Sequence, residues 1–206
     1  MAWDTYVAEV QELVADVISA TVPRPFSMTA STRLLQLLTT CFAHASSAYT
    51  VQLSVLIKGA RGSGKSSMIR SLADEIGFNI VIVECYDLIG DTAVLTEGSI
   101  KAQLDKAKSC APSILLLHQV EALSRKSEST DAGRIPPIVK VLEDALAYLK
   151  EASGETGWPC VMIGTTADED AVPPQVLGCF KQDITLPVSQ QCIRVSQAQA
   201  ETTLGS

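Results

Sequence analysis

The sequence lacks the residue patterns of several common protein classes. It has only two histidines, and none of its six cysteines forms a CxxC pair, so neither a zinc site nor a disulfide scaffold is expected. Its 16 Lys and Arg residues form no cluster and are outnumbered by 23 Asp and Glu residues, which argues against a general nucleic-acid surface. No apolar run approaches the roughly 18 residues of a membrane helix, so direct membrane insertion is not expected either.

The first residues also lack the charge pattern of a targeting signal. They are acidic, and the first base along the chain is Arg24. We therefore expect a soluble intracellular protein whose cysteines are buried free thiols in a reducing compartment. Because 47% of the 206 residues are hydrophobic and only 19% are charged, the chain can bury a core as one compact domain.

Two helical patterns come first in the chain. Apolar residues recur at spacings of three and four over 4–20 and again over 34–42, with a proline-containing break at 21–26. We predict that residues 1–49 form an N-terminal helical segment or linker.

Residues 50–188 are predicted to form an α/β domain. Short apolar runs indicate buried strands at 53–57, 80–83, 114–117, 161–163 and 183–186. Helical patterns cover 66–76, 99–108 and 138–149, and loops are predicted at 128–137 and 154–159. The alternation indicates a five-stranded, mostly parallel sheet between helices. Residues 189–206 are polar, and we expect them to be poorly ordered or to start a further segment.

A phosphate-binding loop is the strongest motif in the sequence. Residues 59–66 match GxxxxGK[ST], and they follow a predicted strand and open a predicted helix, which is the context that the motif requires. The predicted binding residues for ATP or ADP are Gly59, Ala60, Arg61, Gly62, Ser63, Gly64, Lys65, Ser66 and Ser67. Backbone N–H groups would surround the phosphates. Lys65 would reach the β and γ phosphates, and the Ser66 hydroxyl would ligate Mg²⁺ if the metal is bound.

Enzymes with a phosphate-binding loop usually carry a second, acidic motif, and this motif is degenerate in the sequence. Enzymes with this loop normally hold Mg²⁺ with an acidic residue at the end of a buried strand. Here the strand predicted at 114–117 runs into His118 and Gln119. An imidazole is mostly neutral at pH 7 and adds no negative charge, while an amide is not a base. Because general-base catalysis contributes about 10² to 10⁴ in rate, we predict slow or absent hydrolysis.

Glu121 is the carboxylate nearest to this degenerate motif. Its position two residues further along favours a solvated helix start, where a glutamate is stabilised by the helix dipole. A catalytic role for Glu121 remains an alternative.

The sequence then leaves three functional hypotheses. In the first, the domain binds nucleotide without efficient hydrolysis, and the nucleotide stabilises an assembly. In the second, it is an active ATPase or small-molecule kinase that uses Glu121, Glu84 or Asp87. In the third, it is a scaffold in which residues 59–66 no longer bind a ligand.

Several segments together resemble a known family. Residues 59–66, 111–117, 121–123, 161–166 and 184–187 resemble the large subdomain of an AAA ATPase. More narrowly, residues 58–62, 85–91, 96–98 and 176–181 resemble the first AAA module of the fungal peroxisome biogenesis factor 6 family of peroxisomal ATPases. The resemblance implies a P-loop NTPase fold, and it implies a helical lid beyond residue 188 that we expect this chain to lack.

The same resemblance points to further departures from an active module. The sensor asparagine of the family aligns with Ala167, and the arginine fingers should lie near Cys179 and Phe180, yet no arginine occurs between Arg134 and Arg194. The resemblance also implies a cytoplasmic protein that is peripheral to the peroxisomal membrane. There it would join peroxisome biogenesis factor 1 in a heterohexameric ring, with a peroxisomal membrane anchor, and export import receptors.

Overall fold

A parallel sheet with helices on both faces forms the described part of the chain. The structure is a computed structural model that describes residues 28–44, 52–88, 93–124 and 137–187. The strands are β1 (Ser54–Lys58), β2 (Asn79–Glu84), β3 (Ser113–His118), β4 (Cys160–Thr166) and β5 (Gln182–Thr185). They lie in the order β2-β3-β4-β1-β5, and every neighbouring pair is parallel. The prediction of a five-stranded α/β sheet between helices is confirmed, and each of its described strand pairs is parallel.

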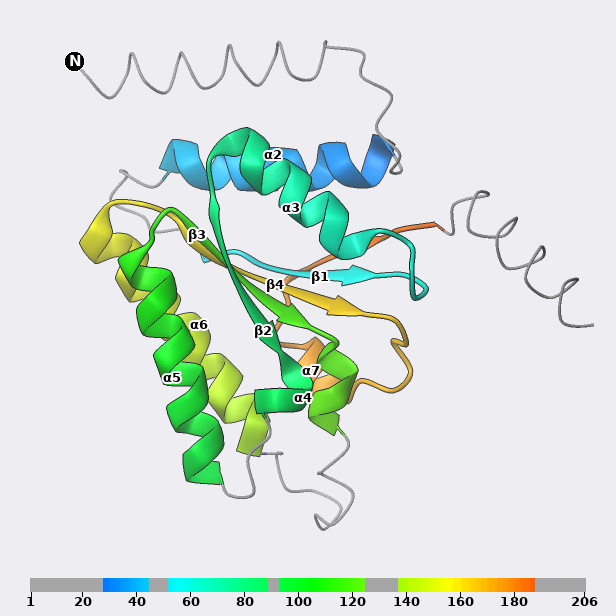
Figure 1. The fold of residues 1–206 in the computed structure, drawn as a ribbon, viewed down its shortest axis with the longest axis vertical. Coiled ribbons are helices and arrows are strands. Elements are labelled where there is room, and N and C mark those ends of the chain that lie inside the picture. The colour runs from blue at the N-terminus through cyan, green and yellow to red at the C-terminus, as the bar shows by residue number, and fades with distance from the viewer. Residues whose placement is uncertain (1–27, 45–51, 89–92, 125–136, 188–206) are drawn as a thin grey trace, which may run out of the picture.

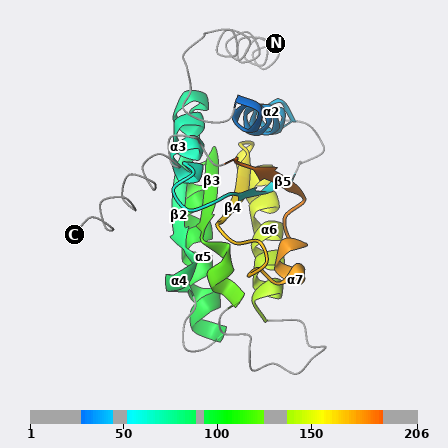
Figure 2. The same cartoon turned by 90° about the vertical axis from the view of Figure 1, so that its right-hand side faces the viewer.

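Helices cover both faces of this sheet (Figures 1 and 2). Helices α2 (Met28–His44) and α3 (Lys65–Ile76) lie on one face, and α5 (Ala93–Ser109) and α6 (Pro137–Thr156) lie on the other. Side chains of a strand alternate between the faces, so the strands contribute to two separate apolar clusters. On β3, for example, Leu116 packs with α2 and α3, whereas Leu117 packs with α5 and α6.

Helix α2 is part of the core of the domain. It confirms the helical pattern predicted at 34–42, and its apolar residues Leu34, Leu35 and Leu38 are almost fully buried. The ring of Phe42 packs edge-on against Phe78, at 4.7 Å between ring centroids. The helix predicted at 4–20, the tail at 189–206 and most of the loop predicted at 128–137 lie outside the described residues.

The structure corrects one loop and adds three short helices. Residues 154–156, predicted as loop, continue helix α6 to Thr156, and Gly157 follows the helix with a φ of 71°. The Ser153 hydroxyl stabilises this extension, because it donates to the Leu149 carbonyl and accepts the Cys160 N–H, joining α6 to the start of β4. Helices α4 (Cys85–Leu88) and α7 (Pro174–Leu177) were not predicted, and η1 (Val120–Ser124) was expected only as a helix start at Glu121, because one helical turn gives no periodic signal.

Within the described residues, no helix is long and apolar enough to cross a bilayer, and no group of three or more His, Cys, Asp or Glu side chains is placed to hold a metal ion. The described cysteines are all free thiols, and only Cys110 among them is not buried.

Burial of Cys41 predicts a loss of stability at alkaline pH. Burial raises the pKa of this thiol from 9.0 to about 11. Between these values the unfolded chain releases the proton and the folded chain keeps it, so the free energy of unfolding falls as pH rises. The contribution of Cys41 is roughly 1.4 kcal/mol by pH 10.

Urea denaturation at pH 8 and pH 10 tests this expectation. The Cys41→Ala variant is less stable at both values because it leaves a cavity, but it should lose roughly 1.4 kcal/mol less stability between them than the parent chain. An equal loss in both proteins would contradict the assignment.

Candidate nucleotide site

The phosphate loop lies at the carboxyl end of β1 and leads directly into α3. Two glycines allow this geometry. Gly64 is the N-cap of α3 with a φ of 85°, and a Cβ on Gly59 would approach the Leu186 carbonyl oxygen to 2.9 Å. No side chain caps α3, so the N–H groups of its first turn are available to an anion.

Lys65 is the buried cation of the loop. Its side chain is only 9% exposed, and its ammonium group donates to the carbonyls of Gly59 and Ala60 at 2.5 and 2.8 Å and to the Ser63 hydroxyl at 3.4 Å. Burial lowers the pKa of Lys65, and the nearby charge of Arg61 adds to this effect, while the negative charge of Glu121 opposes it. Because its partners within the loop are neutral acceptors, the ammonium charge is available to a phosphate group.

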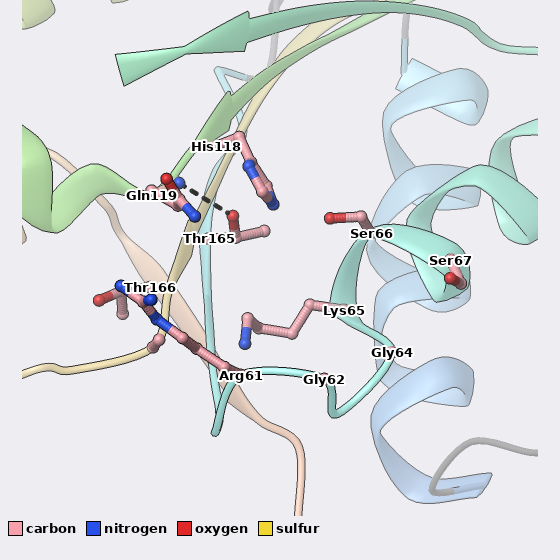
Figure 3. A pocket seen from close by; sticks show the side chains of 11 residues that line it. Arg61, Gly62, Gly64, Lys65, Ser66, Ser67, His118, Gln119, Thr165 and Thr166 are labelled. Atoms are coloured by element: carbon pink, nitrogen blue, oxygen red, sulfur yellow. Dashed lines mark hydrogen bonds between the residues drawn. The ribbon is translucent and has the colours of Figure 1, made fainter. Parts of the chain in front are cut away.

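A cavity of about 360 Å³ opens beside the loop, and Figure 3 shows the side chains that line it. On the loop side the lining comes from Arg61, Gly62, Gly64, Lys65, Ser66 and Ser67. On the strand side it comes from His118, Gln119, Thr165, Thr166 and Ala167. Most of the predicted loop residues thus meet His118 and Gln119 at one cavity. Gly59, Ala60 and Ser63 do not line it, but each accepts a hydrogen bond from Lys65.

The pairing register of the parallel strands brings together the residues on the strand side of the cavity. Parallel pairing sets His118 of β3 opposite Glu84 of β2 and Thr165 of β4. Nδ1 of His118 lies 2.9 Å from a carboxylate oxygen of Glu84, and the Gln119 N–H donates to the Thr165 hydroxyl at 3.4 Å. Gln119 has a φ of 61°, a conformation that is costly for a residue other than glycine and that turns the chain from β3 into η1.

Glu121 is buried, which corrects the expectation of a solvated helix start. Its side chain is 7% exposed, and one carboxylate oxygen accepts the Ala167 N–H at 3.4 Å. It acts electrostatically on Lys65, although it is not among the residues that line the cavity. The carboxylate therefore supplies a counter-charge to the loop lysine without lining the cavity.

Ala167, which the resemblance aligns with the sensor asparagine, brings no polar side chain to the cavity. Ala167 lines the cavity with a methyl group, and its N–H is used by Glu121. The preceding Thr166 hydroxyl is engaged with the backbone of Asp168. Cys179 and Phe180, near which an arginine finger is expected, are both buried.

Two functional positions were missed by reasoning from the sequence. Thr165 was assigned no role from the sequence, yet it lines the cavity. Glu84 was considered as a base, whereas in the structure it is the partner of His118. The alternation of β2 and β4 could have indicated both, because residues at the carboxyl ends of adjacent parallel strands meet at one edge of the sheet.

The residues present fit a nucleotide phosphate better than they fit Mg²⁺. Lys65, the glycines and the uncapped helix are complementary to an anion. Mg²⁺ prefers oxygen ligands and is recruited by carboxylates together with phosphates, but the described residues that line the cavity include no carboxylate. Ser66 provides a hydroxyl, and the position normally held by the acidic residue provides an imidazole.

A comparison with protein families decides the classification. The family model described as "ATPase family associated with various cellular activities (AAA)" matches residues 55–188. The chain belongs to the AAA family of ATPases. The match spans the AAA module from β1 through β5, and it includes the phosphate loop and both sides of the cavity.

Several curated relatives of this AAA module are described as the peroxisomal ATPase PEX6. The chain is similar to the peroxisomal ATPase PEX6 of Yarrowia lipolytica, with 31% identity over 77% of this chain and 14% of that protein. Similar matches are the PEX6 proteins of Pichia angusta, 29% identical over 67% of this chain and 12% of that protein, and Homo sapiens, 26% identical over 72% and 15%. The chain thus resembles a PEX6 module and spans about one seventh of these relatives.

Proposed function

We propose that this AAA module binds ATP or ADP without efficient hydrolysis and that the bound nucleotide stabilises a ring assembly. One observation carries the proposal. The cavity keeps a complete phosphate loop with a buried Lys65, while the residues that line its strand side include no carboxylate. A ligand that binds only the assembled state stabilises that state by mass action, without any chemistry.

Impaired hydrolysis follows from the residues on the strand side. His118 and Gln119 stand where the metal-recruiting acid and the base belong, and neither supplies a carboxylate. Glu121 would be the base of an active enzyme, but it is buried, does not line the cavity and accepts the Ala167 N–H. These contacts support the binding role over the alternative of an active ATPase or kinase.

The relatives support a setting for this role. They are described as peroxisomal ATPases, so we propose that the chain acts in peroxisome biogenesis, in the cytoplasm and peripherally at the peroxisomal membrane. The partners proposed by resemblance are peroxisome biogenesis factor 1, in a heterohexameric ring, and a membrane anchor. We also retain the division into an N-terminal segment at 1–49, a nucleotide-binding subdomain at 50–188 and a tail at 189–206 as a proposal.

Equilibrium binding and single-turnover hydrolysis test the proposal on the 206-residue chain. We expect a fluorescent ATP analogue to bind and Lys65→Ala to weaken binding about 10- to 100-fold, because one charge-assisted contact contributes about 1.5 to 3 kcal/mol. We expect no phosphate release above background.

Asp74→Asn is the matched control, because Asp74 is exposed on α3 and does not line the cavity. This variant should bind like the parent chain. Phosphate release that depends on Lys65 would contradict the proposal and favour an active enzyme.

A further inference from the structure

We propose that the guanidinium group of Arg61 is a second phosphate-binding cation beside Lys65, and that it recognises the terminal phosphate and makes the site selective for nucleoside triphosphates over diphosphates. This inference rests on the proposed nucleotide binding and names the form of nucleotide that the site retains. Arg61 was predicted from the sequence only as part of the phosphate loop, whose backbone N–H groups surround the phosphates. Its side chain has a separate role.

The first support is the position of the Arg61 side chain. Residue 61 lies in the turn that follows β1 and lines the cavity. Figure 3 shows its side chain extending from the phosphate loop toward Thr166, on the strand side of the cavity, whereas Lys65 opens α3. His118 and Gln119 line the same strand side, at the positions from which P-loop enzymes act on the terminal phosphate. The guanidinium group is therefore placed for that phosphate.

The second support is that the guanidinium group is not engaged elsewhere in the described part of the chain. Arg61 is exposed, and it forms no hydrogen bond or ion pair with another described residue. Lys58, at the end of the preceding strand, is by contrast paired with Glu169 and Asp183. An arginine presents its N–H donors in a planar fork that matches phosphate oxygens. The side chain of Arg61 is therefore available for a bidentate contact with a phosphate.

The third support is the balance of charge around the cavity. Glu121 supplies a counter-charge to Lys65, and Nδ1 of His118 lies 2.9 Å from a carboxylate oxygen of Glu84. Arg61 acts on Lys65 in the opposite sense to Glu121 and lowers its pKa, because the two cations repel each other. An anion that contacts both cations relieves this repulsion, and a more highly charged anion gains more. The charges thus favour a triphosphate over a diphosphate.

Equilibrium binding to the 206-residue chain tests this selectivity. ADP is compared with the non-hydrolysable ATP analogue AMP-PNP, so that hydrolysis cannot convert one ligand into the other, and each is titrated in Mg²⁺ and in EDTA. We expect the triphosphate to bind about tenfold more tightly than the diphosphate, the usual contribution of a charge-assisted hydrogen bond. Because the selective group belongs to the protein, the preference should persist in EDTA.

Variants link the preference to the side chain. Arg61→Gln should weaken AMP-PNP binding about tenfold and leave ADP binding nearly unchanged, so that the preference disappears. Arg61→Lys keeps the charge but loses the planar fork, and it should retain part of the preference. Arg70→Gln is the matched control, because Arg70 is exposed on α3 and does not line the cavity. It removes the same charge and should leave both affinities unchanged.

The outcomes separate this inference from the proposed function. Equal affinity of the parent chain for the two nucleotides overturns the inference, and so does an equal loss of both affinities in Arg61→Gln. A preference that is present in Mg²⁺ and lost in EDTA also overturns it, since the selectivity then belongs to the metal complex. In each of these cases nucleotide binding stands. Absence of binding of either nucleotide, in Mg²⁺ and in EDTA alike, overturns the proposed function as well.

Discussion

Replacing Gly164 by valine (Gly164→Val) is expected to lower the free energy of unfolding by about 3 kcal/mol or more. Gly164 lies on β4, next to the apolar cluster that contains Val120 and Phe180. A Cβ at this position would lie 2.7 Å from Cζ and 2.8 Å from Cε1 of Phe180, and 3.0 Å from a methyl group of Val120. Phe180 is 9% exposed, so its ring has little room to move, and overpacking of this kind costs about 1 to 3 kcal/mol for small additions.

A series of variants tests the origin of this effect. Urea denaturation should show an intermediate loss of about 1 to 3 kcal/mol for Gly164→Ala, and Phe180→Leu should recover part of it in the double variant. Gly98→Ala is the control, because a Cβ on this exposed residue of α5 would meet no atom within 4 Å, and it should raise stability by about 0.5 to 1 kcal/mol. Stability of Gly164→Ala equal to that of the parent chain would contradict the predicted clash.

Restoring two carboxylates is expected to produce hydrolysis. The double variant His118→Asp, Gln119→Glu should raise the single-turnover rate of phosphate release in Mg²⁺ by about 10²- to 10⁴-fold, the usual contribution of a general base. Position 118 supplies the negative charge that recruits Mg²⁺, and position 119 supplies the base. Both side chains already line the cavity at the end of β3, and the turn at residue 119 is fixed by its carbonyl, which accepts the Ala122 N–H at 2.9 Å.

The single variants divide the two roles. The His118→Asp variant alone should improve ATP binding in Mg²⁺ with little hydrolysis. The Gln119→Glu variant alone supplies the base but not the negative charge that recruits the metal. Adding Lys65→Ala to the double variant should remove the gain, which excludes a contaminating ATPase. A double variant that is no faster than the parent would place the dominant defect elsewhere, such as at Ala167 or in the lack of the arginine that the resemblance implies near Cys179.

These predictions differ in how far the sequence supports them. His118 and Gln119 could be located from the sequence, because a buried apolar strand ends directly before them and the phosphate loop occurs earlier in the chain. The clash at Gly164 could not, because the apolar run that predicts strand β4 ends at residue 163, and no local pattern marks the glycine after it. Its glycine is explained only by Phe180, which packs against it from beyond α7.

Glu121 shows most clearly why local reasoning failed. A glutamate in the first turn of a helix is ordinarily solvated and favourable to the dipole. In the fold, Glu121 of η1 accepts the Ala167 N–H at the end of β4 and interacts electrostatically with Lys65. The charge of Lys65 offsets the cost of burying this carboxylate, and that compensation depends on three segments that are distant in the chain.

The sequence by itself determined the α/β class, the strand positions and the phosphate loop, because apolar periodicity and glycine spacing are local properties of the chain. Only the tertiary structure decided which groups face the nucleotide cavity. Strand register brought Glu84 to His118, the turn at Gln119 buried Glu121, and packing against Phe180 required Gly164. Such contacts depend on the order and register of strands in space, which no short segment of the sequence encodes.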